Sequence, residues 1–146
     1  MLLIAHRGNI HGKEEDNENK QEYILEAINQ GYDVEVDVWL HNDALYLGHD
    51  GPQYLTDIKF LKNDKLWCHC KNVDVLQRLI ENKVHCFFHK SDDIILTSKG
   101  YMWTFPKKKL VKGSICVMPE YGYQGNISDC IGICSDFIGD WRDYEG

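Results

Sequence analysis

The sequence predicts an α/β fold in which parallel strands form a closed or nearly closed barrel. Short apolar runs alternate with amphipathic or irregular segments along the 146 residues, which is typical of an α/β domain. Two strand-helix-strand steps in the first half imply parallel strands joined by right-handed crossovers. Roughly seven strands follow one another in the hydrophobic pattern, and that number indicates a barrel.

The first half of the chain carries the clearest elements. Residues 2–5 are wholly apolar and predict a short strand. Apolar residues at helical spacing predict a helix over 23–28, which Gly31 ends. Residues 33–40 alternate strictly and predict the second strand, and residues 44–48 are either its continuation or a short hairpin partner.

The second half is predicted to contain strands with few helices. One helical turn is expected at 58–61, and a helix over 73–82 carries its apolar residues on one side. Strands are expected on either side of that helix, over 65–70 and 84–88. Further strands are expected without helices between them, over 101–105, 114–118 and 131–137. A full (β/α)8 barrel has about 250 residues, so residues 1–146 form a single domain that would lack most outer helices after its fourth strand.

Composition and charge narrow the range of partners. The net charge of −7 argues against a nucleic-acid partner held through phosphate contacts. The dense basic run over 107–109 is expected to be a solvated loop, with contact to an anionic substrate or a membrane surface as the alternative. The sequence has no apolar run near the ~20 residues of a transmembrane helix, and its start does not resemble an export signal. A cytoplasmic location is therefore expected.

Cysteine usage points to the same compartment. Six cysteines without an export signal indicate reduced thiols in a cytosol. The spacings of Cys68 with Cys70 and of Cys130 with Cys134 differ from those of paired zinc-knuckle cysteines. These cysteines are expected to act as small core residues, and a structural zinc site is the less favoured alternative.

Polar residues collect where the first two main strands end. His6 and Arg7 follow the first strand directly; an imidazole can move a proton, and a guanidinium can make two parallel bonds to a phosphate. In the second strand, alternation places Glu35 and Asp37 on one face and valines on the other. Two inward-facing carboxylates are costly unless a cation pairs with them, and a hard divalent metal ion would do so. An edge strand with solvent-facing acids is the alternative.

Two further polar clusters follow later strands. His49 comes just after the strand over 44–47 and is predicted to face the same rim as His6. His69 and Lys71 share one face of the third main strand, where an imidazole can bind a metal and a lysine can neutralise phosphate charge. Each pattern alone also fits an exposed turn or an inert buried histidine. Their convergence at the carboxyl ends of parallel strands, where barrel enzymes place their active sites, predicts a catalytic site.

Aromatic residues alternate along one later strand. Tyr101, Trp103 and Phe105 share a face, and an aromatic ring at a barrel mouth can wall a substrate pocket. Trp103 is therefore a candidate substrate-binding residue, with core packing as the alternative. Four further aromatic and histidine residues are expected to be mostly structural: Trp39, Trp67, His85 and His89. Of these, His89 is the one best placed to reach the site, because it ends the fourth strand.

Several of these motifs occur in a specific order. They are Leu3-Ile4-Ala5-His6-Arg7-Gly8, Glu18-Asn19, Asp33-Val34-Glu35-Val36-Asp37-Val38 and Gly48-His49-Asp50. This order resembles the glycerophosphodiester phosphodiesterase family, which belongs to a group with phosphatidylinositol-specific phospholipases C and spider-venom-type sphingomyelinases D. The match is close over residues 2–51 and thin beyond Asn72, although Gly132-Ile133-Cys134-Ser135-Asp136 looks like the family's closing strand.

The resemblance implies a compact or reduced TIM-type barrel with several outer helices missing, and one divalent cation, Mg²⁺ or Ca²⁺. It implies the following roles: Glu35 and Asp37 as metal ligands, His6 and His49 as general acid and base, Arg7 on the phosphate, and Glu18 and Asn19 in support of the first loop. The family commonly has a carboxylate two residues before the third-strand lysine, where this chain has His69 before Lys71. An imidazole ligand suits softer ions such as Mn²⁺ or Zn²⁺, and Glu120 or Asp136 would be alternative oxygen donors.

The implied activity is metal-dependent hydrolysis of glycerophosphodiesters or related phospholipid-headgroup diesters. One histidine would remove a proton from the nucleophile and the other would protonate the leaving alcohol, while Arg7 and Lys71 neutralise developing charge. One alternative is a phospholipase C or D-like lyase that forms a cyclic phosphate. The other is a non-catalytic metal- and phosphate-binding module, which the short length and His69 favour. Barrel surface left bare by missing helices also predicts a homodimer.

Overall fold

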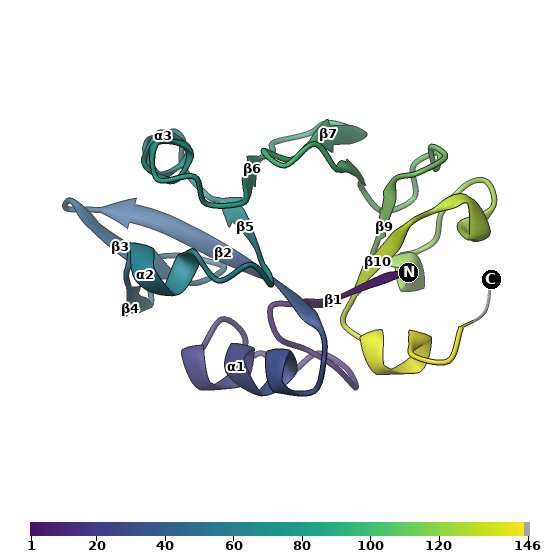
Figure 1. Ribbon diagram of the computed structural model, residues 1–146, viewed down its shortest axis with the longest axis horizontal. Coiled ribbons are helices and arrows are strands. Elements are labelled where there is room, and N and C mark those ends of the chain that lie inside the picture. Colours follow the sequence, from purple (N-terminus) through teal and green to yellow (C-terminus); the bar gives the residue numbers. More distant parts are fainter. Residues whose placement is uncertain (145–146) are drawn as a thin grey trace.

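The computed structural model describes residues 1–144, and these form one mixed sheet with helices on its outer side (Figure 1). The strands are β1 (Leu2–His6), β2 (Asp33–His41), β3 (Ala44–Leu47), β4 (Tyr54–Thr56), β5 (Leu66–Cys70), β6 (Cys86–Phe88), β7 (Ile94–Leu96), β8 (Met102–Thr104), β9 (Ile115–Val117) and β10 (Gly132–Ser135). The α-helices are α1 (Gln21–Asn29), α2 (Ile58–Leu61) and α3 (Val73–Glu81). Short 3-10 helices are η1 (Pro119–Tyr121), η2 (Ile127–Asp129) and η3 (Ile138–Trp141).

Most strands of the sheet run parallel, in the order β6-β5-β2-β1-β10-β9-β8. β7 adds an antiparallel edge next to β8, and β3 and β4 form an antiparallel extension of β2. Within residues 1–144 no strand ladder joins β6 to β7, although the Ser98 amide donates a hydrogen bond to the Cys86 carbonyl at 2.9 Å. The predicted α/β class and the parallel arrangement are therefore confirmed.

The sheet does not show the TIM-type barrel that the sequence predicts. Such a barrel has eight parallel strands, each followed by a helix, whereas this sheet also contains antiparallel strands and is not closed between β6 and β7. In the described part of the chain no α-helix follows α3, so the connections after β8 and β9 are extended segments and 3-10 turns. The predicted scarcity of helices in the second half is confirmed.

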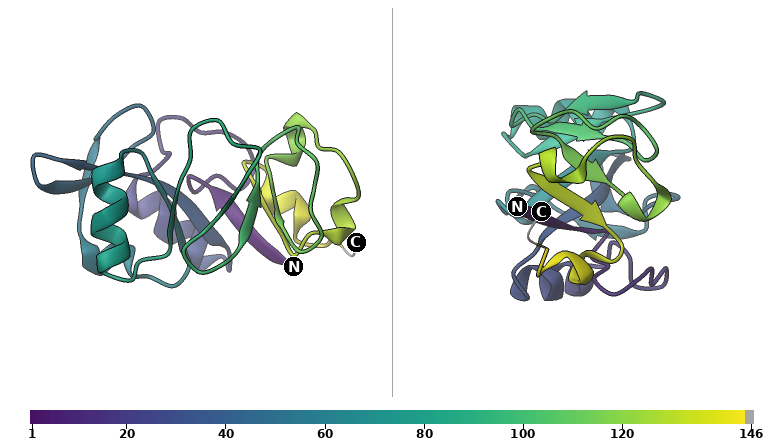
Figure 2. Two further views of the ribbon diagram at one scale, coloured as in Figure 1. Left: turned by 90° about the horizontal axis from the view of Figure 1, so that it is seen from above. Right: turned by 90° about the vertical axis from the view of Figure 1, so that its right-hand side faces the viewer.

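The hairpin of β2 and β3 projects at one end of the molecule, opposite the η3 segment (Figure 1 and Figure 2). Asn42 and Asp43 have φ of 50° and 62°, as a two-residue type I′ turn requires. The segment over 44–48 is thus a hairpin partner of β2. Sequence pattern does not predict β4 and β7, because three residues are too few to show a period and both strands depend on pairing with a neighbour.

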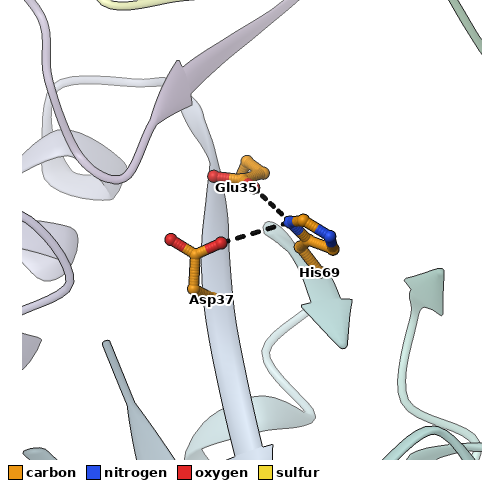
Figure 3. A group of neighbouring side chains, drawn as sticks. All are labelled: Glu35, Asp37 and His69. Carbon is orange, nitrogen blue, oxygen red and sulfur yellow. Dashed lines mark ion pairs between the residues drawn. The ribbon is translucent and has the colours of Figure 1, made fainter. Parts of the chain in front are cut away.

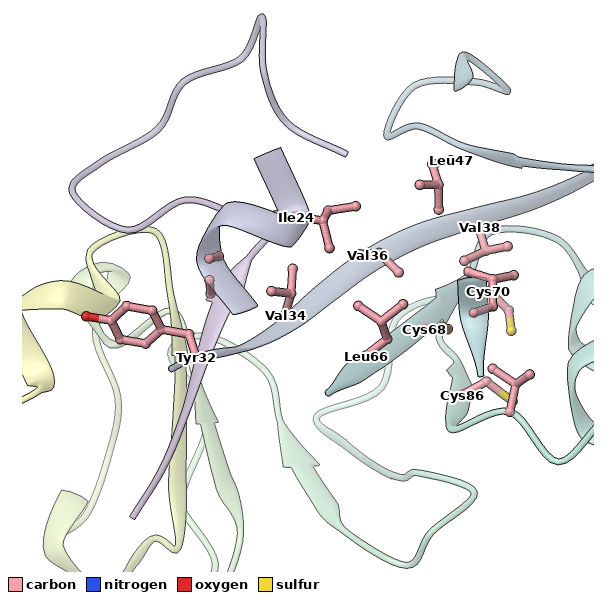
Figure 4. Close-up of a cluster of buried hydrophobic side chains, with 14 of the residues drawn as sticks. Ile24, Tyr32, Val34, Val36, Val38, Leu47, Leu66, Cys68, Cys70 and Cys86 are labelled. Carbon is pink, nitrogen blue, oxygen red and sulfur yellow. The ribbon is translucent and has the colours of Figure 1, made fainter. Parts of the chain in front are cut away.

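The two faces of β2 separate the interior of the curved sheet from an outer layer. Glu35 and Asp37 lie on the inner face, close to His69 of β5 (Figure 3). The valines of β2 lie on the outer face, fully buried in a cluster with residues of α1 and α3 (Figure 4). A one-residue slip would turn these valines out of the outer cluster and turn Glu35 and Asp37 into it. Each buried valine is worth about 1.5–3 kcal/mol, so the outer cluster holds the two carboxylates on the inner face.

Aromatic and aliphatic side chains fill the interior on the amino-terminal side of the strands. The ring centroids of Trp67 and Trp103 lie 5.5 Å apart, and Phe87 packs against Trp103 at 4.9 Å. Ile4 and Ile115 join this cluster, and each of the five residues is at most 3% exposed. The cluster therefore fills the interior on the amino-terminal side of the strands.

His85 is a buried histidine beside this cluster. Its ring centroid lies 4.4 Å from that of Trp67, and its Nε2 lies 2.9 Å from the Thr97 hydroxyl oxygen. Burial, with a smaller effect of the Lys99 charge, lowers the pKa of His85 to about 4. The imidazole is therefore neutral at physiological pH, in agreement with the structural role expected for it.

We expect His85 to make the fold sensitive to acid. The unfolded chain protonates this side chain near a pKa of about 6.5, whereas the folded protein resists protonation until about pH 4. The free energy of unfolding should therefore fall by about 2 kcal/mol over this pH range, with partial solvent screening allowed for. Urea titrations at about pH 7 and about pH 4.5 measure the loss, which should shrink in His85→Gln because glutamine does not titrate. His41→Gln, at an exposed position, is the control and should lose as much unfolding free energy in acid as the wild type. An equally large loss in His85→Gln would contradict the prediction.

The cysteines occupy the core, as predicted. Cys68, Cys70 and Cys86 pack in the outer cluster (Figure 4), and all six cysteines are buried with free thiols. The group of metal-binding side chains found within residues 1–144 contains no cysteine. No helix in this part of the chain is both long enough and apolar enough to cross a bilayer.

Exposed leucines lie on both antiparallel edges of the sheet. Leu55 of β4 is 70% exposed and Leu96 of β7 is 65% exposed. Edge strands with apolar side chains can pair with another chain. The homodimer expected from bare barrel surface stays a prediction, and size-exclusion chromatography at high protein concentration tests it.

Candidate functional site

Strands β1, β2 and β5 contribute side chains to the wall of one cavity of about 320 Å³. Nearly all of the predicted site residues line it: His6, Arg7, Glu35, His49, His69, Lys71 and Trp103. The remaining one, Asp37, is fully buried next to Glu35 and His69. The fold therefore brings together polar residues that lie far apart in the sequence.

Glu35, Asp37 and His69 form a compact group that can hold a metal ion. Parallel pairing of β2 with β5 places Asp37 opposite His69, and alternation places Glu35 on the same face of β2. His69 Nδ1 lies 3.2 Å from Asp37 Oδ1 and 3.7 Å from Glu35 Oε2 (Figure 3). One donor atom from each residue lies within 4.8 Å of the others, which is a spacing that a single cation can bridge.

Unsatisfied oxygens in this group fit a divalent cation. Glu35 Oε1 and Asp37 Oδ1 are buried and have no hydrogen-bond partner within residues 1–144. Leaving a buried polar acceptor without a hydrogen bond costs about 1–3 kcal/mol. A cation coordinated by these oxygens would remove that cost, and carboxylate oxygens are ligands that divalent ions accept. The residues present therefore fit a bound metal ion.

The two carboxylates differ in their affinity for protons. Burial, together with the nearby charge of Asp37, raises the pKa of Glu35. Burial would raise the pKa of Asp37 as well, but its contact with His69 and the Arg7 charge hold that pKa well below its usual range. Asp37 is thus a carboxylate at all physiological pH values, whereas Glu35 gains full charge most readily when a cation is present.

His6 forms a hydrogen-bonded pair with Asp136. Its Nδ1 donates to Asp136 Oδ1 at 2.7 Å, and its Nε2 lies 3.9 Å from Glu35 Oε1. Burial would lower the pKa of His6, but the charge of Glu35 and the hydrogen bond to Asp136 outweigh it and raise that pKa. Because Asp136 holds Nδ1, Nε2 is the ring nitrogen left without a hydrogen bond to Asp136.

The loop after β1 places Arg7 between two carboxylates. Its Nε lies 3.1 Å from Asp37 Oδ2, and its Nη1 donates to Glu18 Oε1 at 3.4 Å. Asn19 braces the same loop, because its Nδ2 donates to Asp37 Oδ2 at 3.0 Å and its Oδ1 accepts the Asp37 amide at 2.9 Å. Arg7 thus neutralises buried acids with two of its nitrogens and lines the cavity with the remainder.

His49 stands in a tight turn after β3. Gly48 has φ of 154°, and a Cβ at that position would clash with the Gly51 carbonyl, so only glycine allows the turn. His49 Nδ1 lies 2.8 Å from Asp50 Oδ1. Partial burial and the Arg7 charge lower the pKa of His49. A neutral imidazole that can accept a proton therefore borders the cavity.

Lys71 leaves β5 at a position fixed by β2. Its backbone N–H donates to the Val38 carbonyl at 2.9 Å. The next residue, Asn72, caps α3 by accepting the Val75 amide at 3.1 Å. These two hydrogen bonds fix where the chain leaves β5, and the Lys71 side chain lines the cavity.

Glu120 and Asp136, the alternative oxygen donors, lie outside the Glu35–Asp37–His69 group and make hydrogen bonds of their own. Glu120 accepts from the Ser135 hydroxyl at 2.8 Å and from the Asp136 amide at 3.1 Å. Asp136 Oδ1 accepts from both His6 and Asn9. Parallel pairing of β1 with β10 brings Asp136 beside His6. In the sequence, the polar pair Ser135-Asp136 at the end of an apolar strand indicates a contact at this position. It does not specify that His6 is the residue that Asp136 contacts.

Aromatic rings form the wall opposite the polar groups of the cavity lining. His89, expected to be mostly structural, lines the cavity, and its ring stacks on Phe105 with centroids 3.5 Å apart. Burial and the nearby His69 lower the pKa of His89. Trp103 lines the cavity but is only 2% exposed. Trp103 therefore combines both roles considered for it, core packing and a share of the wall.

A second cavity of about 440 Å³ lies beside the first. Both cavities are lined by Arg7, Lys13 and His49. The second is otherwise polar and mostly acidic, with Glu15, Asp16, Glu18, Asn19, Asp50 and Gln53 in its wall. His49 therefore stands between a cavity with an aromatic side and a polar one.

One cavity thus brings together three side chains that can bind a metal ion, the His6–Asp136 pair and the basic side chains of Arg7 and Lys71. Comparison of the chain with protein-family models, with curated protein sequences and with solved structures gives no match. What the protein does is therefore inferred from the geometry of its site.

Proposed function

We propose that this protein is a metal-dependent phosphodiesterase that hydrolyses glycerophosphodiesters or related phospholipid-headgroup diesters. The observation that carries the proposal is that the His6–Asp136 pair and the Glu35–Asp37–His69 group meet at one cavity. An acid-base group next to a cation site is what displacement at phosphorus requires. The motif order that resembles glycerophosphodiester phosphodiesterases supports the same activity, and the curved sheet would then be a reduced TIM-type barrel.

Each residue has a defined task in the proposed reaction. A divalent cation held by Glu35, Asp37 and His69 would stabilise negative charge on a phosphoryl oxygen. His6, held at Nδ1 by Asp136, transfers a proton at Nε2. His49 serves as the second acid-base group, because its lowered pKa keeps it neutral and able to accept a proton.

The two cavities on either side of His49 fit the two substituents of a diester. The smaller one, with Trp103 and Phe105 in its wall, suits the less polar substituent. The larger, acidic one suits a hydroxylated or amine-bearing substituent. The phosphate of the diester would lie between the two cavities. Lys71, which lines the first cavity, would neutralise the phosphate charge.

A turnover assay with metal-stripped protein tests the proposal. Bis(p-nitrophenyl) phosphate is offered with Mg²⁺, Ca²⁺, Mn²⁺ or Co²⁺ in turn, and we expect nitrophenol release that a chelator stops and the added ion restores. Phosphorus NMR of the products from a glycerophosphodiester separates hydrolysis from the lyase reaction, which yields a cyclic phosphate. Absence of turnover with every ion, in folded protein with metal bound, would contradict the proposal and favour the non-catalytic binding module.

A further inference from the structure

His69 supplies an imidazole nitrogen that is already aimed at the two carboxylates. Its Nδ1 lies 3.2 Å from Asp37 Oδ1 and 3.7 Å from Glu35 Oε2. The ring stacks on Phe87, with centroids 5.1 Å apart and planes 9° apart. Strand pairing also fixes the backbone of His69 directly opposite Asp37. A ligand held on both its backbone and its ring needs little reorganisation to bind a metal ion.

Asp37 can offer only one of its oxygens to a cation. Its Oδ2 accepts from Asn19 at 3.0 Å and lies 3.1 Å from Arg7 Nε. Its Oδ1 remains without a hydrogen-bond partner within residues 1–144, as does Glu35 Oε1. Two oxygens from Glu35 and one from Asp37 make three oxygens at most from this group, beside the single nitrogen of His69.

Asp136 and Glu120, the two other carboxylates considered as oxygen donors, lie outside this group and already accept hydrogen bonds. Asp136 Oδ1 accepts from His6 and Asn9, and both Glu120 oxygens accept from the last strand and the residue after it. Ca²⁺ normally takes about six to eight oxygen ligands. This group supplies at most three of them, and its remaining donor is an imidazole, which favours transition-metal ions over Mg²⁺ and Ca²⁺.

We propose that this site selects a divalent transition-metal ion, of the series from Mn²⁺ to Zn²⁺, over Mg²⁺ and Ca²⁺, through ligation by His69 Nδ1. The inference deepens the proposed function by naming the class of ion at the same site. It concerns binding alone, so it is measured on the metal-loaded protein without any substrate.

Pulsed electron paramagnetic resonance of bound Mn²⁺ tests the ligand directly. The full chain, stripped of metal and loaded with one equivalent of Mn²⁺, should show nitrogen modulation of the spin echo from the coordinated imidazole. His69→Glu should bind Mn²⁺ without that modulation, because it replaces the nitrogen donor by a carboxylate. His89→Gln is the matched control: its ring centroid lies 6.1 Å from that of His69, and the modulation should persist when it is removed.

Competition with a chromophoric chelator tests the selectivity. We expect the ratio of Co²⁺ affinity to Mg²⁺ or Ca²⁺ affinity to fall by about 10–100-fold in His69→Glu, the usual scale for changes around a metal site. His69→Gln, a neutral replacement, covers the case in which the extra charge of glutamate prevents folding, and its ratio should fall as well. Co²⁺ replaces Zn²⁺ in this comparison because the six thiols would bind Zn²⁺ in any unfolded chain.

The outcomes separate this inference from the proposed function. An unchanged affinity ratio in both variants, or nitrogen modulation that persists in His69→Glu, would overturn the inference even if the protein hydrolyses diesters. Loss of the modulation and of the selectivity in a protein that hydrolyses no diester would support the inference and count against the proposed function.

Discussion

Replacing His6 by alanine is expected to lower kcat for phosphodiester hydrolysis by about 10²–10⁴-fold, the usual contribution of a general acid-base group. His6 lines the cavity, and its Nδ1 hydrogen bond to Asp136 leaves Nε2 for proton transfer. Because His6 is not among the residues that hold the cation, metal affinity should change much less than kcat. Turnover of bis(p-nitrophenyl) phosphate at saturating metal, beside a direct metal titration, measures both quantities.

His41→Ala is the matched control for this substitution. His41 is an exposed histidine at the far end of β2, where it contacts Asn42 and Tyr46 instead of the cavity. Its replacement should leave kcat unchanged. If His6→Ala turns over as fast as His41→Ala, His6 is not the acid-base group, and the mechanism proposed above is wrong.

Asp136→Asn is expected to lower kcat by about 10²–10⁴-fold, because in an aspartate–histidine pair this replacement favours the wrong imidazole tautomer. The amide keeps the shape of the side chain but can donate to Nδ1, which moves the His6 proton to Nε2. Asp136 acts through His6, so it is a positioning residue. The expected loss is in kcat, with KM nearly unchanged.

The pH dependence separates positioning from a merely structural role. The hydrogen bond and the charge of Asp136 both raise the pKa of His6. Removing that charge should lower this pKa and move the corresponding limb of the pH profile of kcat/KM to lower pH. Asp136→Glu restores the charge and should recover part of the rate. Asp140→Asn, at an exposed carboxylate in η3, is the control, and a limb that stays in place in Asp136→Asn would contradict the positioning role.

Most of the secondary structure follows from local patterns. The strict alternation over 33–40 identifies β2, because a strand with one apolar face can bury it only in one register. Helical spacing identifies α1 and α3 in the same way. The strands β4 and β7 do not follow from any such pattern. They are short, and pairing with a neighbour stabilises them more than their own residues do.

The tertiary structure decides one property of the fold, the closure of the sheet. The sequence predicts parallel strands and few helices in the second half of the chain, and the structure shows both. Closure of the sheet depends on whether β6 and β7 pair. No strand ladder joins them within residues 1–144, and β7 pairs instead with β8 as an antiparallel edge strand. Closure is a property of the whole sheet, since strand tilt and stagger must agree around the ring, and no single segment encodes it.

The sequence by itself determined which residues approach the site. A side chain that follows a parallel strand, or that alternates with buried valines, must lie at the carboxyl edge or on the inner face, and this placed His6, Glu35, Asp37 and His69 correctly. Only the tertiary structure decided how these groups are partnered. It joined His6 to Asp136 across 130 positions of the chain and Arg7 to Asp37. Periodicity fixes the direction of a side chain relative to its own strand, whereas a hydrogen-bond partner depends on which distant strand lies next to it.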